Sequence, residues 1–246
     1  MSSSLGDRSV VITRSSTQNE SLRRLLESVG ANVVEVPLIA IEEPEDEGRE
    51  RDEVLQRVHD FDWVVVTSPN GAERVAPFLA AAIAADDEAP FPFLAAVGSA
   101  TANTIGVAAS LVAEPARAEV LAAEFPVGTG RVLVVQGNLA DASLSAAIES
   151  KGWDVTRVVA YRTVHLRPAA EMREPALAAD VLLLASGSAA TAWFDAFGTD
   201  TPEHVVAIGP STAKVATGLG FRVSATAPEQ TLESLVETAA QVVDAG

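Results

Sequence analysis

The sequence of 246 residues contains no cysteine. Disulfides, thiolate nucleophiles, iron–sulfur clusters and cysteine zinc sites are therefore excluded. Histidine is scarce as well, because His59, His165 and His204 are the only three, and none lies four residues from another. No His-Glu-x-x-His motif is present. We therefore expect no catalytic metal, and a magnesium site built from carboxylates is the alternative that stays open.

Basic residues are few. Lysine and arginine together number 17 against 34 aspartates and glutamates, which gives a formal net charge of −17. A phosphate backbone requires a basic surface, so we expect no nucleic-acid partner. The acidity favours solubility or adaptation to salt over a special acidic-surface function. The acidic run at residues 42–47 is interpreted as a solvated loop without a catalytic role.

Long apolar runs are also missing. No run reaches the roughly 18 residues that suggest a spanning helix, so we expect no membrane association. The first residues lack a basic segment followed by an apolar one, which leads us to expect a cytoplasmic protein. Hydrophobic residues nevertheless make up 48% of the chain, enough for a folded core.

Short runs of valine, isoleucine and leucine alternate with amphipathic stretches. The predicted strands are Val10–Thr13, Val33–Val36, Trp63–Thr67, Leu94–Val97, Val132–Val135, Val155–Ala160, Val181–Ala185, Val205–Ile208 and Val223–Ala225. Predicted helices include Glu20–Val29, Gly71–Ala85, Ser143–Lys151, Ala189–Phe197, Ser211–Leu219 and Leu232–Val243. Because most strand runs are continuously apolar, they suit parallel sheets buried on both faces, and the alternation predicts an α/β fold.

Three blocks of the sequence recur loosely in the same order. Residues 10–36 align with 132–158, and in both the predicted helix leads into Glu-Ser-x-Gly-x-x-Val. Residues 64–68 then resemble 182–186. Finally, the segment at 97–102 is similar to the one at 208–213. Three blocks in one order predict two related α/β halves.

Six turns between a predicted strand and a predicted helix hold small or polar residues. They are Arg14-Ser15-Ser16, Thr67-Ser68-Pro69-Asn70-Gly71, Gly98-Ser99-Ala100-Thr101, Gln136-Gly137-Asn138, Ser186-Gly187-Ser188 and Gly209-Pro210-Ser211-Thr212. Turns at the carboxyl ends of parallel strands bind ligands, and helix N-termini attract anions. For any single turn, helix N-capping explains the small and polar residues better than anion binding does. Six such turns from two halves, however, make a shared anion-binding site a competing hypothesis.

Known nucleotide and hydrolase motifs are lacking. No Gly-x-Gly-x-x-Gly follows a strand, no P-loop is present, and Ser-Gly-Ser is not a nucleophile elbow. Tyr161, the only tyrosine, follows a predicted strand, and a phenol can donate a proton to a leaving group. From its position alone, Tyr161 is better interpreted as an aromatic residue at an interface, with its hydroxyl hydrogen-bonded, than as a proton donor. Arg14, Arg162 and Lys214 are candidate partners for carboxylates.

The ordered set of these segments resembles the uroporphyrinogen-III synthase family. The matching pieces are Val11–Arg14, Phe61–Ala72, Val97–Ala102, Gln136–Asn138, Val159–Thr163, Ser186–Ala189 and Ala207–Ala213. Each alone is unspecific, but together they span nearly the whole chain in family order. The Thr-Ser-Pro turn, Tyr-Arg-Thr and Ile-Gly-Pro-Ser-Thr-Ala are the most specific.

The resemblance implies two flavodoxin-like parallel-sheet domains joined by a two-stranded linker. One domain would be discontinuous, with residues 1–37 and 167–246, and the other would comprise residues 44–160. Residues 38–43 and 161–166 would form the linker. It further implies a cofactor-free enzyme, expected to be a monomer, that converts hydroxymethylbilane to uroporphyrinogen III with loss of water and inversion of the last pyrrole ring.

In this reading Tyr161 is the candidate acid that assists the departure of water. The candidate substrate-binding residues, which lie in or next to the six turns, are Arg14, Thr67, Ser68, Asn70, Gly98, Thr101, Gly137, Asn138, Ser186, Ser188, Gly209, Thr212 and Lys214. Two alternatives stay open. One is a non-catalytic two-domain module that binds a tetrapyrrole or another polyanion, and the other is a different enzyme on a flavodoxin-like scaffold.

Overall fold

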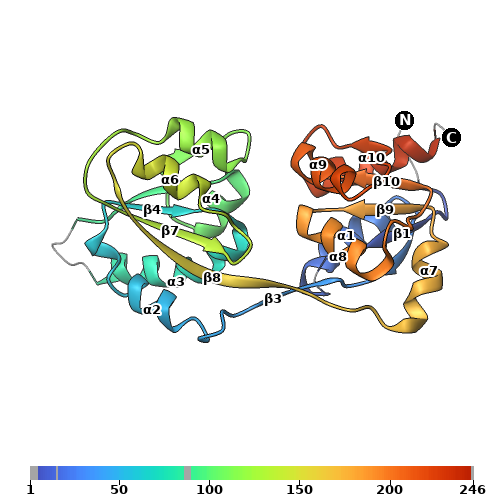
Figure 1. The fold of residues 1–246 in the computed structure, drawn as a ribbon, viewed down its shortest axis with the longest axis horizontal. Coiled ribbons are helices and arrows are strands. Elements are labelled where there is room, and N and C mark those ends of the chain that lie inside the picture. Colours follow the sequence, from blue (N-terminus) through green and yellow to red (C-terminus); the bar gives the residue numbers. More distant parts are fainter. Residues whose placement is uncertain (1–4, 15, 86–89, 245–246) are drawn as a thin grey trace. The chain divides into compact units, whose positions relative to one another are not determined.

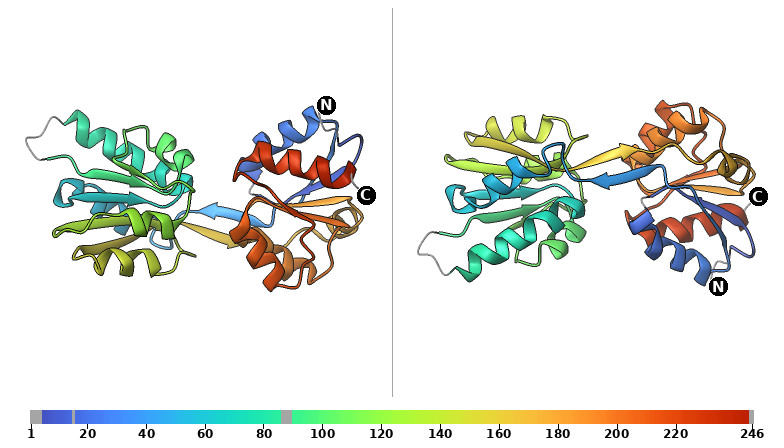
Figure 2. Two further views of the ribbon diagram at one scale, coloured as in Figure 1. Left: turned by 90° about the horizontal axis from the view of Figure 1, so that it is seen from above. Right: turned by 90° about the horizontal axis from the view of Figure 1, so that it is seen from below.

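The computed structural model describes residues 5–14, 16–85 and 90–244, and only the backbone of residues 16–18. The chain divides into two compact units. Unit 1 comprises Met1–Ala40 and Val164–Gly246, and unit 2 comprises Ile41–Thr163. The two points at which the chain passes between the units, 40/41 and 163/164, lie within the segments expected as a linker. Each unit has helices on both faces of its sheet (Figures 1 and 2).

The sheet of unit 1 has five strands in the order β11-β10-β9-β1-β2, and all its neighbouring strands are parallel. They are β1 (Ser9–Ile12), β2 (Asn32–Glu35), β9 (Val181–Leu184), β10 (His204–Ala207) and β11 (Ala225–Thr226). Counted along the chain of this unit, the order is 2-1-3-4-5, which is the flavodoxin-like arrangement. Val10, Val11 and Ile12 are all fully buried, because helices cover both faces.

The sheet of unit 2 has the order β3-β8-β7-β4-β5-β6. Its strands are β3 (Ile39–Glu42), β4 (Trp63–Val66), β5 (Phe93–Ala96), β6 (Leu111–Val112), β7 (Arg131–Gly137) and β8 (Asp154–His165). The pairs from β8 to β6 are parallel, and β3 forms the edge next to β8. The expected α/β class with parallel sheets is therefore confirmed.

The three repeated sequence blocks occupy equivalent places in the two sheets. The first block forms β1 and β2 in unit 1 and β7 and β8 in unit 2, and the second forms most of β9 in unit 1 and of β4 in unit 2. The third block directly follows β10 in unit 1 and β5 in unit 2 and contains the starts of α9 and α4. The series β2-β1-β9-β10-β11 therefore matches β8-β7-β4-β5-β6 position by position. The first block stands at the start of unit 1 but at the end of unit 2. The equivalent strands therefore have the same spatial order in the two sheets but follow one another differently along the chain.

Ten α-helices cover these sheets in the described part of the chain. They are α1 (Ser16–Ser28), α2 (Arg49–Leu55), α3 (Pro69–Ala84), α4 (Ser99–Ile105), α5 (Ala118–Glu124), α6 (Ser143–Glu149), α7 (Arg173–Leu177), α8 (Gly187–Phe197), α9 (Pro210–Gly218) and α10 (Leu232–Asp244). Short 3-10 helices lie at Val58–Asp60 and Ala170–Met172. None of the helices within the described ranges is long and apolar enough to cross a membrane.

Each sheet has a hydrophobic core on both faces. In unit 1, Val11 packs in one cluster with Trp193 of α8, while Val10 packs in another with Leu26 of α1 and Leu235 of α10. Trp193 is fully buried, and its indole N–H donates to the Asp200 carbonyl at 2.9 Å. Because successive strand residues point to opposite faces, the continuous apolar runs supply both cores at once.

Some elements differ from the sequence-based prediction. Strand β8 runs to His165 rather than ending at Ala160, so Tyr161 lies inside the strand. The last strand is β11 at Ala225–Thr226, later than predicted. The predictions also gave no bounds for β6, α2, α5 and α7, which have two to seven residues each, and for α4 they gave only the turn at its start. Elements this short carry too few periods of hydrophobic alternation to stand out.

Candidate functional site

The candidate residues collect at the carboxyl ends of the central strands of each unit. In unit 2 the chain continues from β4 toward one edge of the sheet and from β7 toward the other, so the strand order reverses between these two strands. In unit 1 the same reversal lies between β1 and β9. Ligands of open α/β sheets bind at such reversals, outside the carboxyl ends of the strands. The two places are therefore the positions in the fold best suited to a ligand.

In unit 2 the fold brings Tyr161 together with Ser68. The phenol oxygen of Tyr161 on β8 lies 3.0 Å from Oγ of Ser68, which follows β4. Ser68 is the N-cap of α3, and its Oγ accepts a hydrogen bond from the Gly71 N–H at 3.2 Å. A serine at this position satisfies a helix N–H and fixes where the helix begins. The half-buried phenol is thus linked through one hydroxyl to a helix N-terminus.

The end of β7 lies directly against Tyr161. A Cβ atom at Gly137 would come 2.7 Å from Cζ of Tyr161, so only glycine leaves room for the ring. Asn138 donates its N–H to the Tyr161 carbonyl at 3.1 Å, and its Oδ1 accepts from the Thr163 N–H at 2.8 Å. Thr67 Oγ1 donates to the Val135 carbonyl at 3.2 Å. These contacts hold β8 in place beside the ends of β7 and β4.

One expected helix N-terminus is absent from this turn. Gly137 ends β7, and the next helix, α6, begins only at Ser143. The N–H of Ser143 donates to the Asp141 carboxylate at 2.8 Å, and hydrogen bonds from the Ser143 side chain and backbone lower the pKa of Asp141. The predicted helix start at Ser143 is therefore confirmed, but a loop separates it from Gly137 and Asn138, so the expectation that these two residues lead directly into a helix is wrong.

The remaining unit 2 candidates lie at α3 and α4. Asn70 is in the first turn of α3, and its carbonyl accepts from Arg74 Nη1 at 3.0 Å. Gly98 precedes α4 with φ +88°, a conformation that favours glycine. Thr101 is 1% exposed, and its hydroxyl donates to the Val97 carbonyl at 2.9 Å. The Thr101 hydroxyl is therefore turned into its own helix.

In unit 1, Ser186 repeats the role of Ser68. It is the N-cap of α8, accepts from the Ala189 N–H at 3.1 Å and lies 3.0 Å from the Ser188 hydroxyl. Arg14 follows β1 on the other side of the strand-order reversal, and burial lowers the pKa of its guanidinium. Its neighbour Ser15, named in the expected turn, lies outside the described residues.

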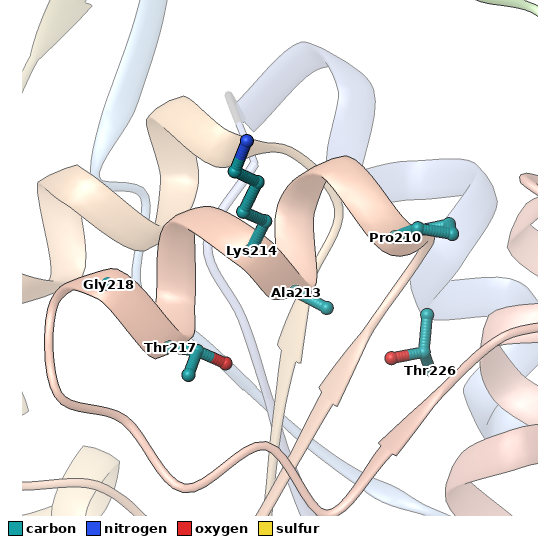
Figure 3. A pocket seen from close by; sticks show the side chains of 6 residues that line it. All are labelled: Pro210, Ala213, Lys214, Thr217, Gly218 and Thr226. Atoms are coloured by element: carbon teal, nitrogen blue, oxygen red, sulfur yellow. The ribbon is translucent and has the colours of Figure 1, made fainter.

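The third turn of unit 1 leads into α9. Gly209 precedes the helix, and Thr212 is buried in its first turn with 4% exposure. Lys214 is exposed and extends from the helix on a different side from Thr217 (Figure 3). A depression of about 530 Å³ is lined by Pro210, Ala213, Lys214, Thr217, Gly218 and Thr226. Lys214 thus places a cation at the surface of the helix that follows β10.

Sequence reasoning missed the charged residues around Tyr161. The acidic run at 42–47 is half-exposed to exposed over most of its length, but Glu43 accepts from both Arg51 and Arg74. Arg162, expected as a substrate partner, pairs with the protein's own Glu42 and Glu45 at 3.2 Å each. No local signal pointed to these contacts, because Glu43, Arg51 and Arg74 lie far from Tyr161 along the chain. Within the described ranges, no cluster of three or more histidines and carboxylates could hold a metal.

Fold and site together define the class: two flavodoxin-like α/β units of matching strand order, each with small and hydroxyl residues at the carboxyl ends of its central strands. The family model described as uroporphyrinogen-III synthase HemD matches residues 20–237. The chain therefore belongs to the uroporphyrinogen-III synthase family, whose members are enzymes that cyclise hydroxymethylbilane. This confirms the family predicted from the ordered motifs.

Individual relatives agree with this family. The chain is 31% identical over 228 residues to a chloroplastic uroporphyrinogen-III synthase of Oryza sativa subsp. japonica, covering 87% of this chain and 73% of the relative. It is 29% identical over 162 residues to the uroporphyrinogen-III synthase of Synechococcus elongatus, covering 63% of this chain and 61% of the relative.

Solved structures show the same fold. A mutant uroporphyrinogen III synthase from the extremely thermophilic bacterium Thermus thermophilus aligns with a TM-score of 0.68 at 20% identity, covering 98% of this chain and 100% of that one. A uroporphyrinogen-III synthetase from Helicobacter pylori aligns with a TM-score of 0.59 at 17% identity, covering 96% and 99%.

Proposed function

We propose that this chain converts hydroxymethylbilane to uroporphyrinogen III, with loss of water and inversion of the last pyrrole ring. Membership of the synthase family supports the reaction. The contact between Tyr161 and Ser68 at the strand-order reversal of unit 2 carries the assignment of the chemistry to particular residues. It places a proton donor where open α/β sheets bind their ligands.

Tyr161 acts as the acid for the departing hydroxyl. The Gly71 N–H donates to Ser68 Oγ, and either hydroxyl can be the donor in the 3.0 Å contact between Ser68 Oγ and the phenol oxygen. With the Ser68 hydroxyl as donor, the phenol proton is left for the substrate. Hydrogen bonds in such a chain polarise one another, and the helix N-terminus favours negative charge on the phenol. Both effects stabilise the negative charge that develops on the phenol oxygen during proton transfer.

The proton balance closes within one turnover. Tyr161 protonates the terminal hydroxyl group, which leaves as water and gives an azafulvene cation. The substituted carbon of the last pyrrole attacks this cation, and the resulting spiro intermediate fragments and closes again with the ring inverted. The pyrrole carbon that forms the final bond loses its proton, and this proton restores the phenol. General acid catalysis of this kind contributes about 10²- to 10⁴-fold to a rate.

The carboxylates of the substrate are held by local donors in each unit. N–H groups and hydroxyls at the starts of α3, α8 and α9 supply neutral donors, while Arg14 and Lys214 supply charge. Because the protein carries a net charge of −17, long-range attraction of a polyanion is unfavourable. Binding of the substrate therefore depends on short-range hydrogen bonds. Much of the catalysis comes from holding the flexible linear tetrapyrrole in one productive conformation.

The test is turnover of freshly generated hydroxymethylbilane, with the oxidised products resolved as porphyrin isomers. We expect isomer III to exceed isomer I, which forms spontaneously. Isomer I alone, from protein shown to be folded by circular dichroism, would favour the non-catalytic binding module. Activity that survives dialysis against a chelator would support a reaction without a metal. A monomeric state and a cytoplasmic location stay predictions, and light scattering would test the first of them.

A further inference from the structure

Arginines and acidic residues form a compact network behind Tyr161. The guanidinium of Arg51, whose side chain is 9% exposed, donates to Glu43 Oε2 at 2.6 Å, to Asp52 at 2.7 Å and to the Ala160 carbonyl at 2.9 Å. The other oxygen of Glu43 accepts from Arg74 Nε at 2.9 Å. One carboxylate therefore holds two guanidinium groups. Through the Ala160 carbonyl the network reaches the residue directly before Tyr161.

The charges in this network stabilise each other. Burial acts to lower the pKa of Arg51, but hydrogen bonds to Asp52 and Glu43 outweigh it, so the pKa of Arg51 is raised. Arg162 adds a third cation, because its Nε donates to the Glu43 carbonyl at 3.2 Å. Hydrogen bonds between oppositely charged groups are stronger than neutral ones, and a guanidinium that makes several of them is fixed in orientation.

Arg74 is the member of the network that faces the phenol. Its Cζ lies 5.7 Å from the centroid of the Tyr161 ring, and its side chain is 18% exposed. Its Nε is held by Glu43, and its Nη1 is held by the Asn70 carbonyl at 3.0 Å. A guanidinium fixed at both points cannot leave the ring without breaking two hydrogen bonds. The ring is thus confined between Arg74, Gly137 and Ser68.

We propose that Arg74 is a positioning residue for Tyr161, held over the ring by Glu43, and that its charge favours proton donation by the phenol. The proposal rests on the proposed synthase function and adds to it a residue that acts through the acid. A cation near the ring stabilises the phenolate more than the neutral phenol, since opposite charges attract more strongly at a partly desolvated site. Arg74 therefore stabilises the negative charge that develops on the phenol oxygen during proton transfer and also fixes the direction of the ring.

The experiment compares Arg74→Gln with wild type under saturating hydroxymethylbilane. We expect kcat to fall about ten-fold with KM changed less than two-fold, because the residue acts on the acid rather than on binding. A residue with only a structural role would lower the melting temperature without lowering kcat selectively.

A double-mutant cycle with Tyr161→Phe decides whether Arg74 acts through the phenol. In the Tyr161→Phe background we expect Arg74→Gln to change kcat less than two-fold. The same ten-fold loss in both backgrounds, or a loss confined to KM, would overturn the proposal. If Arg74→Gln does not fold, Arg74→Lys serves instead, since it keeps the charge and should keep kcat within about three-fold of wild type; a ten-fold loss of kcat in that variant would also refute the idea.

Arg131→Gln is the matched control. Arg131 also stacks on an aromatic ring of unit 2, with its Cζ 4.7 Å from the Phe61 centroid, but it begins β7 while Gly137 ends it. We expect this variant to keep the wild-type kcat. Failure of the synthase function itself would be distinguishable, because the wild-type protein would then produce no excess of isomer III.

Discussion

Replacing Gly137 by alanine should displace Tyr161 and slow the reaction. The added Cβ would lie 2.7 Å from Cζ, 2.9 Å from Cε2 and 2.9 Å from the phenol oxygen of Tyr161. Ordinary contacts between carbon atoms are about 3.5–4.0 Å, so the ring must retreat by about 1 Å. The φ angle of Gly137 is not in the left-handed region, so the alanine backbone itself is unstrained. The clash is with the side chain alone.

The size of the effect follows from this displacement. A shift of about 1 Å from a productive geometry can cost about 10²-fold in rate. Excess volume in a packed site costs about 1–3 kcal/mol, and we expect the low end because the Tyr161 ring is half-buried. For a chain of this length, about 1 kcal/mol corresponds to a fall in melting temperature of roughly 2–4 °C. Activity should therefore fall much more than stability.

The assay is kcat for isomer III formation, with the melting temperature measured in parallel. Gly218→Ala is the matched control, because a Cβ there would meet nothing within 4 Å. We expect Gly218→Ala to stay within about two-fold of wild type. A Gly137→Ala enzyme with unchanged kcat, or one that loses the same factor again in the Tyr161→Phe background, would refute the reasoning.

Three further changes test other parts of the structure. Thr212→Val removes a hydroxyl from the first turn of α9 and should raise KM or lower the melting temperature, and unchanged values of both would exclude Thr212 from the site. Gly98→Ala should destabilise the protein to urea by more than about 1 kcal/mol, because φ is +88° and the new Cβ would lie 2.4 Å from that of Ala116. Hydrogen bonds from the Ser9 side chain and backbone, with Arg8 nearby, lower the pKa of Asp180. A depressed carboxyl pKa stabilises the fold above the unfolded-state value near 3.9, and this contribution disappears as pH falls through the folded-state value. Asp180→Asn should therefore lower the urea midpoint more at pH 7 than at pH 2, and equal losses at both pH values would contradict this assignment.

Much of the fold was accessible from the sequence because its signals are local or repeated. The apolar runs identified the central strands, and the three repeated blocks predicted two related halves, which the matching strand orders of the two sheets confirm. The ordered turns also identified the family. These features depend on hydrophobic patterning and turn chemistry, which neighbouring residues encode.

The contacts of the candidate site were less accessible because they join distant segments. Arg51 meets the Ala160 carbonyl across 109 positions, and Glu43 meets Arg74 across 31. Both depend on β3 forming the edge next to β8, which no local pattern encodes. The approach of Gly137 to Tyr161 likewise follows from a register shift between β7 and β8 at Gln136/Gly137. Such details arise from tertiary packing rather than from propensity.

The most direct test of the account is the single-turnover rate of isomer III formation by the Tyr161→Phe enzyme. This substitution keeps the aromatic ring and removes only the hydroxyl that contacts Ser68. We expect the rate to fall about 100-fold, equivalent to about 2.7 kcal/mol of transition-state stabilisation, with a melting temperature close to that of wild type. A rate equal to that of wild type would remove the phenol from the mechanism and contradict the assignment of Tyr161 as the acid.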